Sequence, residues 1–217
     1  MTSFAQARSH MVEGQIRPNK VTDEALLDVM AAIPREKFVP KPLQGVAYLD
    51  EDLLVGDNRY MMEPMVFARL LDAANIKETD VVLDIACGRG YSSAVLSKLS
   101  EAVVALEDNE ELANYATDQL AEIGCDNVAV VTRDLTKGYP EQGPYDIILI
   151  NGLVEHVPSE LIDQLSPEGR LLCVMAINGV GKACLFTNFN GVKGRREIFE
   201  ASVPALESFT QEKGFTF

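Results

Sequence analysis

Histidines and paired cysteines are scarce in this sequence, and their scarcity argues against several kinds of site. The 217-residue chain has two histidines, His10 and His156, which lie far apart. A zinc or iron site and a serine–histidine hydrolase both need histidine beside other ligands or bases, so neither is supported. The four cysteines include no Cys-x-x-Cys pair, and we interpret them as small buried hydrophobic residues in a reducing compartment.

Basic residues and long apolar runs are also few. The chain has 19 lysines and arginines against 33 aspartates and glutamates, for a formal net charge of −14. Phosphate neutralisation needs clustered basic side chains, so we expect no nucleic-acid partner. The one dense basic cluster, Lys193-Gly194-Arg195-Arg196, is interpreted as a solvated hairpin turn in preference to a binding site. No apolar stretch approaches the roughly 20 residues that span a bilayer, and the start of the chain has no apolar signal region; we expect a cytoplasmic protein without a membrane partner.

A glycine-punctuated turn is the most informative feature that the sequence does contain. The apolar run 81–85 leads into Ala86-Cys87-Gly88-Arg89-Gly90, and small and apolar residues then follow at helical spacing. This pattern predicts a buried parallel strand, a tight turn and a helix. Glycines let a ligand approach the backbone closely, and the N-terminus of the helix offers free N–H groups to an anion. The same pattern also occurs where a helix merely packs closely on a strand.

Acidic residues follow three successive strands of the predicted sheet. Asp84 ends the first strand, Glu107 ends the run from Ala102, and Asp134 follows the run from Val128. Glu107 stands about where a nucleotide-binding unit places the carboxylate that grips a ribose. The carboxyl ends of parallel strands are the edge at which open α/β folds bind ligands, so these residues predict a ligand site.

The chain divides into two parts with different patterns of expected secondary structure. From residue 80 the expected elements are strands 81–85, 102–107, 127–132, 145–150 and 169–176 with helices 91–99, 110–122 and 158–165. The turn Asn190-Gly191 predicts a closing antiparallel hairpin. Residues 1–79 instead suggest a cap, with helices near 25–33 and 64–74, an extended segment 35–42 and a loop 47–57. We expect one domain, 1–217, built from the cap 1–79 and a Rossmann-like core 80–217.

Eight motifs resemble those of a known family in their order and spacing. They are Met11-Val12-x-x-Gln15-Ile16, Pro34-Arg35-Glu36-x-Phe38-Val39-Pro40, Ala47-Tyr48-x-Asp50, Leu53-x-Val55-Gly56, Gly88-x-Gly90-Tyr91, Gly138-Tyr139-Pro140, Pro144-Tyr145-Asp146 and Gly169-Arg170-Leu171. On these motifs, residues 8–176 resemble the protein-L-isoaspartate O-methyltransferase family of class I S-adenosylmethionine-dependent methyltransferases. The resemblance implies an α/β, Rossmann-like fold: a mostly parallel seven-stranded sheet, a C-terminal antiparallel hairpin and an N-terminal helical cap.

The resemblance also implies S-adenosyl-L-methionine as the cofactor and a set of residues that bind it. Those implied around its methionyl end are Asp84, Ala86, Cys87, Gly88 and Gly90. Glu107 would bind the ribose hydroxyls, and Asp134 with the Leu135 backbone would face the adenine. Ala86 replaces the family's usual glycine, a change that is tolerated if this residue has φ below zero.

The loop that the resemblance assigns to the substrate departs from the family. Where the family has a Gly-Gln-Thr-Ile-Ser-Gln-Pro-like sequence, this chain has Asn58-Arg59-Tyr60-Met61-Met62-Glu63-Pro64. Met62 stands at the position of a hydroxyl residue that contacts the isoaspartyl substrate, and a thioether cannot donate a hydrogen bond. Losing one such contact is worth about 1–3 kcal/mol, which weakens activity without forbidding it.

Other residues near this loop have more than one interpretation. Arg59 either binds the substrate carboxylate, compensating for Met62, or pairs with Asp57 or Glu63 on the surface. Tyr60 is a candidate substrate residue; alternatively, Tyr60, Met61 and Met62 plug the pocket or form an apolar floor for a different acceptor. Asn151, at the end of the fourth parallel strand, either faces the site or is an ordinary loop asparagine.

The leading hypothesis is an S-adenosylmethionine-dependent carboxyl O-methyltransferase that acts on L-isoaspartyl residues of damaged proteins. A carboxylate acceptor is ionised at neutral pH, so the reaction needs positioning and no general base. The alternatives are a methyltransferase of the same fold with another acceptor, such as a small molecule, and a non-catalytic S-adenosylmethionine-binding paralogue. A nicotinamide-dependent oxidoreductase is disfavoured because Gly88-x-Gly90 lacks the third glycine of that fingerprint.

Overall fold

A mixed β-sheet forms the centre of the molecule. The computed structural model describes residues 3–189 and 191–210. Within them, seven strands pair in the order β5-β4-β3-β6-β7-β8-β9. The bounds are β3 Val81–Ile85, β4 Ala102–Glu107, β5 Val128–Thr132, β6 Tyr145–Val154, β7 Leu165–Ile177, β8 Val180–Phe189 and β9 Val192–Glu200. Pairs from β5 to β7 are parallel, and β7-β8 and β8-β9 are antiparallel. The predicted α/β fold with a C-terminal antiparallel hairpin is confirmed.

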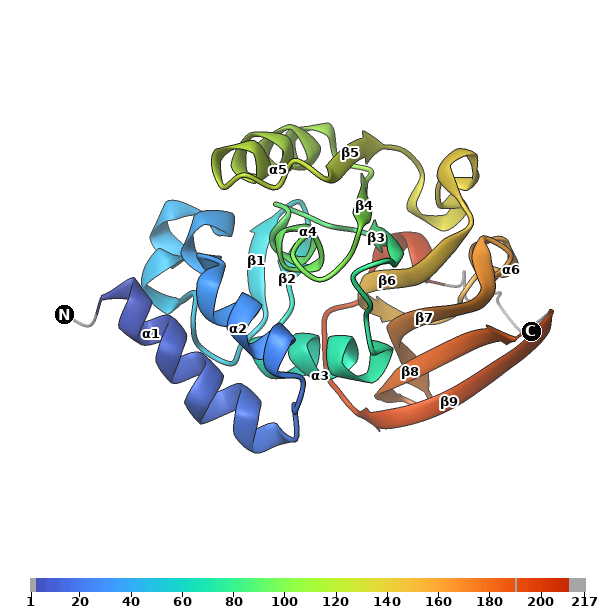
Figure 1. Ribbon diagram of the computed structural model, residues 1–217, viewed down its shortest axis with the longest axis horizontal. Coiled ribbons are helices and arrows are strands. Elements are labelled where there is room, and N and C mark those ends of the chain that lie inside the picture. The colour runs from blue at the N-terminus through green and yellow to red at the C-terminus, as the bar shows by residue number, and fades with distance from the viewer. Residues whose placement is uncertain (1–2, 190, 211–217) are drawn as a thin grey trace, which may run out of the picture.

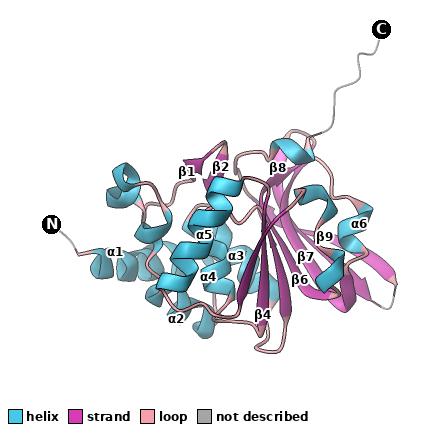
Figure 2. Ribbon diagram, turned by 90° about the horizontal axis from the view of Figure 1, so that it is seen from above, coloured by secondary structure: helices cyan, strands magenta, loops and turns pink. Residues whose placement is uncertain are grey.

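Helices cover both faces of this sheet. Figure 2 shows α3, α4 and α5 on one face and α6 on the other. Their bounds are α3 Pro64–Ala74, α4 Tyr91–Leu96, α5 Glu110–Glu122 and α6 Ser159–Ile162. The strands are therefore buried on both sides, which explains their unbroken apolar sequences: Val82, Leu83 and Ile85 of β3 are all 0% exposed. One apolar cluster forms on each face of the sheet.

The N-terminal residues form short helices that pack against α3, α4 and α5 (Figure 1). In order they are α1 Phe4–Met11, the π-helical turn η1 Val12–Ile16, the 3-10 turn η2 Arg17–Asn19, α2 Glu24–Ala32, and the 3-10 turns η3 Arg35–Phe38 and η4 Lys41–Val46. The expected extended segment 35–42 is wrong, because its prolines stand at the starts of 3-10 turns instead. Helix α1 was not predicted from the sequence.

The expected loop 47–57 is wrong at its end. Residues Leu53–Gly56 form strand β1, which pairs with β2, Arg59–Met61, as a separate antiparallel hairpin. The short 3-10 turns η5 Leu135–Lys137, η6 Pro140–Gln142 and η7 Glu207–Phe209 complete the secondary structure.

The hairpin predicted at Asn190-Gly191 joins β8 to β9, and these strands pair as expected. Asn190 itself lies outside the described residues. Across residues 3–189 and 191–210, no helix has both the length and the apolar character to cross a membrane.

Candidate cofactor and acceptor site

Left-handed backbone shapes the turn that follows β3. Residues Ala86, Gly88 and Gly90 have φ values of 59°, 57° and 94°. We expected Ala86 to replace the family's glycine with a negative φ, and this expectation is wrong. The backbone N–H groups of Ala86 and Cys87 both donate to the carbonyl of Leu106, at 2.8 and 3.3 Å, and so bind the turn to β4. These bonds offset the roughly 1–2 kcal/mol that a left-handed conformation costs a residue with a Cβ.

Asp84 is buried beneath the turn and fully engaged in hydrogen bonds. Its Oδ2 accepts from the hydroxyls of Ser92 and Ser93 at 2.6 and 2.5 Å, and its Oδ1 accepts from Asn151 Nδ2 at 2.6 Å. Burial raises the pKa of Asp84 to about 6, although the three donors act to lower it. Asn151 also donates to the carbonyl of Ile85 at 2.9 Å. This network fixes the end of β3 and residue Asn151, within β6, against the first turn of α4.

Glu107, at the end of β4, forms a buried ion pair with Arg59. Arg59 Nε lies 3.2 and 3.1 Å from Oε1 and Oε2 of Glu107, and Arg59 Nη2 lies 2.9 Å from Oε1. The Glu107 side chain is 0% exposed and that of Arg59 is 9% exposed. The backbone N–H of Gly88 donates to Oε2 at 2.8 Å. Arg59 also contacts Asp108 Oδ1 at 2.7 Å, and the two carboxylates raise the pKa of Arg59 against the opposing effect of burial.

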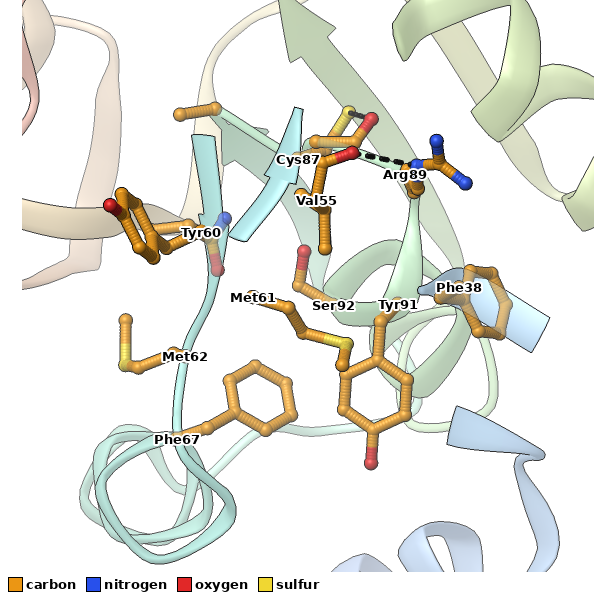
Figure 3. A pocket seen from close by; sticks show the side chains of 13 residues that line it. Phe38, Val55, Tyr60, Met61, Met62, Phe67, Cys87, Arg89, Tyr91 and Ser92 are labelled. Carbon is orange, nitrogen blue, oxygen red and sulfur yellow. Dashed lines mark hydrogen bonds between the residues drawn. The ribbon is translucent and has the colours of Figure 1, made fainter. Parts of the chain in front are cut away.

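The hairpin β1–β2 carries Arg59 to this position. Asp57 and Asn58 form its turn with φ values of 41° and 53°, and these two residue types tolerate left-handed backbone. Residues of β2 then alternate in direction. Figure 3 shows Met61 directed towards Tyr91, whereas Tyr60 and Met62 lie on the other side of the strand.

A small cavity of about 20 Å³ lies between the hairpin and the glycine turn. It is lined by Phe38, Val55, Tyr60, Met61, Met62, Phe67, Ala86, Cys87, Gly88, Arg89, Tyr91, Ser92 and Asn151. The Arg89 guanidinium does not fill it: Nε donates to the Val55 carbonyl at 2.8 Å, and the group lies over the Tyr115 ring, directed out of the cavity in Figure 3.

A second cavity, of about 10 Å³, shares Tyr60, Met62 and Asn151 with the first. Its remaining lining includes Asp52 and the segment Val203–Leu206. Tyr60, Met62 and Asn151 therefore separate the glycine turn from a second space, which has a carboxylate in its wall.

Arg35 braces the base of the hairpin from inside the cap. It is 0% exposed; its Nε donates to the Ala47 carbonyl at 2.7 Å, and its Nη2 donates to the Met62 carbonyl at 2.6 Å. Its guanidinium carbon lies 4.7 Å from the centre of the Tyr91 ring. Among the described residues, no carboxylate forms an ion pair with Arg35, and burial lowers its pKa. The Pro34-Arg35-Glu36 motif thus positions the segment that contains Met62.

Asp134 and Leu135 do not line the cavity of about 20 Å³ between the hairpin and the glycine turn. Asp134 Oδ1 accepts from the backbone N–H and the hydroxyl of Thr136, at 2.9 and 2.6 Å, and these bonds lower the pKa of Asp134. Asp134 lines an open cavity of about 690 Å³, whereas the Leu135 side chain is 1% exposed. Both follow β5, which is the neighbour of β4, as the sequence indicates.

The structure brings most of the candidate residues together but changes one pairing. Neither partner expected for a surface Arg59, Asp57 or Glu63, forms its ion pair; Glu107 and Asp108 do. Sequence reasoning also missed Asp108 and the two serines that bind Asp84. Asp108 directly follows Glu107, and the serines stand in the first turn after the glycines, so their positions were the available signal.

A family model described as protein-L-isoaspartate(D-aspartate) O-methyltransferase matches residues 6–191. A protein-L-isoaspartate O-methyltransferase of Methanoculleus marisnigri is 40% identical over 165 residues, which cover 76% of this chain and 75% of that protein. One of Koribacter versatilis is 37% identical over 172 residues, or 79% of this chain and 78% of that protein.

Two solved structures share the fold. One, described as a protein-L-isoaspartate O-methyltransferase, has a TM-score of 0.80 at 24% identity, over 93% of this chain and 67% of that one. The other is a Plasmodium falciparum protein described as a beta-aspartate methyltransferase in complex with S-adenosyl-L-homocysteine. Its TM-score is 0.78 at 18% identity, over 93% of this chain and 98% of that one.

Proposed function

Because this chain belongs to the protein-L-isoaspartate(D-aspartate) O-methyltransferase family, we propose that it methylates the side-chain carboxylate of L-isoaspartyl residues in peptides or proteins. S-adenosyl-L-methionine is the methyl donor of this family of enzymes. The observation that carries the proposal is the match of the family model to residues 6–191, which include both the glycine turn and the hairpin.

The residues at the ends of β3 and β4 suit this cofactor chemically. Glu107 has two carboxylate oxygens that can accept hydrogen bonds from two vicinal hydroxyls, and Gly88 and Gly90 bring backbone close to a ligand. Burial raises the pKa of Glu107, with Arg59 acting against it. Arg59 supplies to Glu107 the donors that a ribose would otherwise supply. Glu107 would hold the ribose, and residues 84–90 the methionyl end; Asp134 and Leu135 would face the adenine.

The cofactor supplies an electrophilic methyl group on a sulfonium, and the protein supplies position. A carboxylate acceptor is already ionised at neutral pH, so no side chain must remove a proton from it. The Asp84 network fixes the turn, and the cap residues Phe38 and Phe67 form, with Tyr91 of α4, an apolar wall that excludes water. Tyr60 and Asn151 are proposed to contact the acceptor because they line both cavities.

Met62 and Arg59 are proposed to tune how the acceptor binds. Met62 is 5% exposed and offers no hydrogen bond from its thioether. Arg59 could bind the acceptor carboxylate only after it leaves Glu107. These features, with Asp52 in the cavity wall, favour as second candidate a methyltransferase that acts on an uncharged or cationic acceptor.

Labelled methyl transfer distinguishes the two functions. The proposal predicts transfer from S-adenosylmethionine to an isoaspartyl peptide and none to the matching aspartyl peptide. Binding of S-adenosylhomocysteine without turnover of the isoaspartyl peptide would instead support the second candidate. A cytoplasmic location, a single 1–217 domain and the lack of a nucleic-acid or membrane partner remain predictions from the sequence.

A further inference from the structure

Arg59 already donates hydrogen bonds to the carboxylate of Glu107, the residue proposed to bind the ribose of the cofactor. A carboxylate has about four acceptor sites on its two oxygens. In Glu107, Arg59 fills part of them through Nε and Nη2, and the backbone N–H groups of Gly88 and Asp108 donate at 2.8 and 3.1 Å. Two arginine N–H groups equal in number the two hydroxyls of a ribose. The guanidinium and the ribose therefore compete for the same oxygens.

The hairpin also fills the space above the glycine turn. A cavity of about 20 Å³ has room for little more than one water, whereas pockets for small-molecule ligands are about 300–1,000 Å³. A methyl group placed on Gly88 would lie 3.2 Å from Arg59 Cγ and 3.3 Å from Val55 Cγ2. The side chains of the hairpin thus pack directly on the backbone that a cofactor must approach.

We propose that Arg59 is a latch: S-adenosylmethionine binds only when the Arg59 guanidinium leaves Glu107 and the hairpin turn lifts from the glycine turn. This inference rests on the proposed function, because Glu107 is taken as the ribose ligand.

The surroundings of Arg59 allow this movement. The Asp108 side chain is 36% exposed and already binds Arg59 Nη2 at 2.7 Å, so the guanidinium keeps an anionic partner while it turns towards solvent. Besides the bond from Arg89 Nε to the Val55 carbonyl of β1 at 2.8 Å, the hairpin turn is held by exposed bonds from Asn109 to Asp57 at 2.7 Å and from Asn58 to Glu207 at 3.0 Å. Water can replace these exposed partners at little cost.

The latch has opposite effects on the empty and the loaded protein. Buried Glu107 needs a positive or hydrogen-bonding partner, so Arg59 stabilises the empty protein. The apparent dissociation constant of the cofactor equals its intrinsic value divided by the fraction of molecules in which the latch is open. Removing Arg59 should therefore lower the stability of the unliganded protein and tighten cofactor binding together. If Arg59 only shaped the site, its removal would lower both the stability of the protein and its affinity for the cofactor.

Calorimetric titration with S-adenosylhomocysteine, combined with thermal unfolding, tests the latch. We expect Arg59→Gln to bind S-adenosylhomocysteine at least about tenfold more tightly than the wild type, equivalent to about 1.4 kcal/mol, while the unliganded protein melts at a lower temperature. Arg59→Lys keeps the charge but not the two-nitrogen contact, and should fall between the two. Arg17→Gln is the matched control, because Arg17 forms an exposed ion pair with Glu24; it should change neither measurement.

Unchanged or weaker binding by Arg59→Gln overturns the latch. Should that variant not fold, Arg59→Lys carries the same test, with a smaller tightening expected. Glu107→Gln separates this inference from the proposed function. If Glu107→Gln binds more weakly but Arg59→Gln does not bind more tightly, the cofactor site stands and the latch fails. If the folded wild type and Arg59→Gln both fail to bind, the proposed function fails with it.

Discussion

Two buried arginines of the N-terminal half, Arg35 and Arg59, have different partners. Arg35 donates to two backbone carbonyls and lies over an aromatic ring, whereas Arg59 binds the carboxylates of Glu107 and Asp108. No mobile ligand can replace the partners of Arg35, but a diol can replace the guanidinium on Glu107. Arg35 therefore fixes the base of the hairpin β1–β2, whereas Arg59 holds the end of the hairpin near its turn only until a ligand binds.

Replacing Arg35 should have the largest effect on stability, because Arg35 fixes the base of the hairpin. Arg35→Met leaves the carbonyls of Ala47 and Met62 buried without donors, which should lower the free energy of unfolding by about 2–4 kcal/mol. Chemical denaturation measures it, and Arg17→Met is the exposed control. A loss below about 1 kcal/mol would show that Arg35 is not a structural brace.

Replacing Asp84 should change how stability depends on pH. The pKa of Asp84 is raised from 3.8 to about 6 in the folded protein, chiefly by burial. The folded state therefore binds more protons than the unfolded state between these values, and its stability falls as pH rises from about 4 to about 6. Asp84→Asn should lack this component, worth about 2–3 kcal/mol. Denaturation curves of both proteins over that range test it; parallel pH profiles would contradict it.

Met62 directly follows β2, and its carbonyl accepts the hydrogen bond from Arg35. Its replacement tests whether this end of the hairpin contacts the methyl acceptor. Met62→Ser restores a hydroxyl and should raise kcat/KM on an isoaspartyl peptide by about tenfold, the value of one hydrogen bond. Met61→Ser is the matched control, since Met61 is similarly buried but directed towards Tyr91. An unchanged or lower rate in Met62→Ser would mean that the loop serves another acceptor.

Glu63 should show the smallest effect. Burial, with Asp52, Asp50 and Glu51 nearby, raises the pKa of Glu63 from 4.5 to about 7. Above pH 7 Glu63 is ionised in the folded protein, and its charge then lowers stability, so Glu63→Gln should stabilise the protein more at pH 8 than at pH 6. Glu63 is partly exposed to solvent, which limits the gain to a few tenths of a kcal/mol. Melting temperatures at both pH values test this, with exposed Glu168→Gln as control; an equal shift at both would refute it.

The sequence predicted the core better than the cap. In the core, strand 81–85 matches because it is an apolar run before a glycine turn, and helix 110–122 matches because it has an apolar period after Asn109. In the cap, helix 64–74 matches for the same reason, with Pro64 at its start. The segment 35–42 failed because a proline suits the start of a 3-10 turn as well as an extended chain. Helix α1 has one buried residue, Met11, and so almost no apolar period.

The candidate residues at the strand ends could be predicted from the sequence, but the contacts between the cap and the core could not. Glu107 follows from its place after an apolar strand. Its pairing with Arg59 depends on a hairpin whose turn, Asp57-Asn58, brings together residues 48 positions apart. Local spacing carries no information about such a contact. The φ of Ala86 was likewise set by hydrogen bonds to β4 and not by its own preference.

A crystal structure of the protein with S-adenosylhomocysteine tests the central claim most directly. The account predicts that the ribose hydroxyls lie within hydrogen-bonding distance of Glu107, that Arg59 has moved towards Asp108 and solvent, and that the glycine turn faces the homocysteine group. A complex in which Arg59 still binds Glu107, with the ligand held elsewhere, would contradict both the assigned site and the latch.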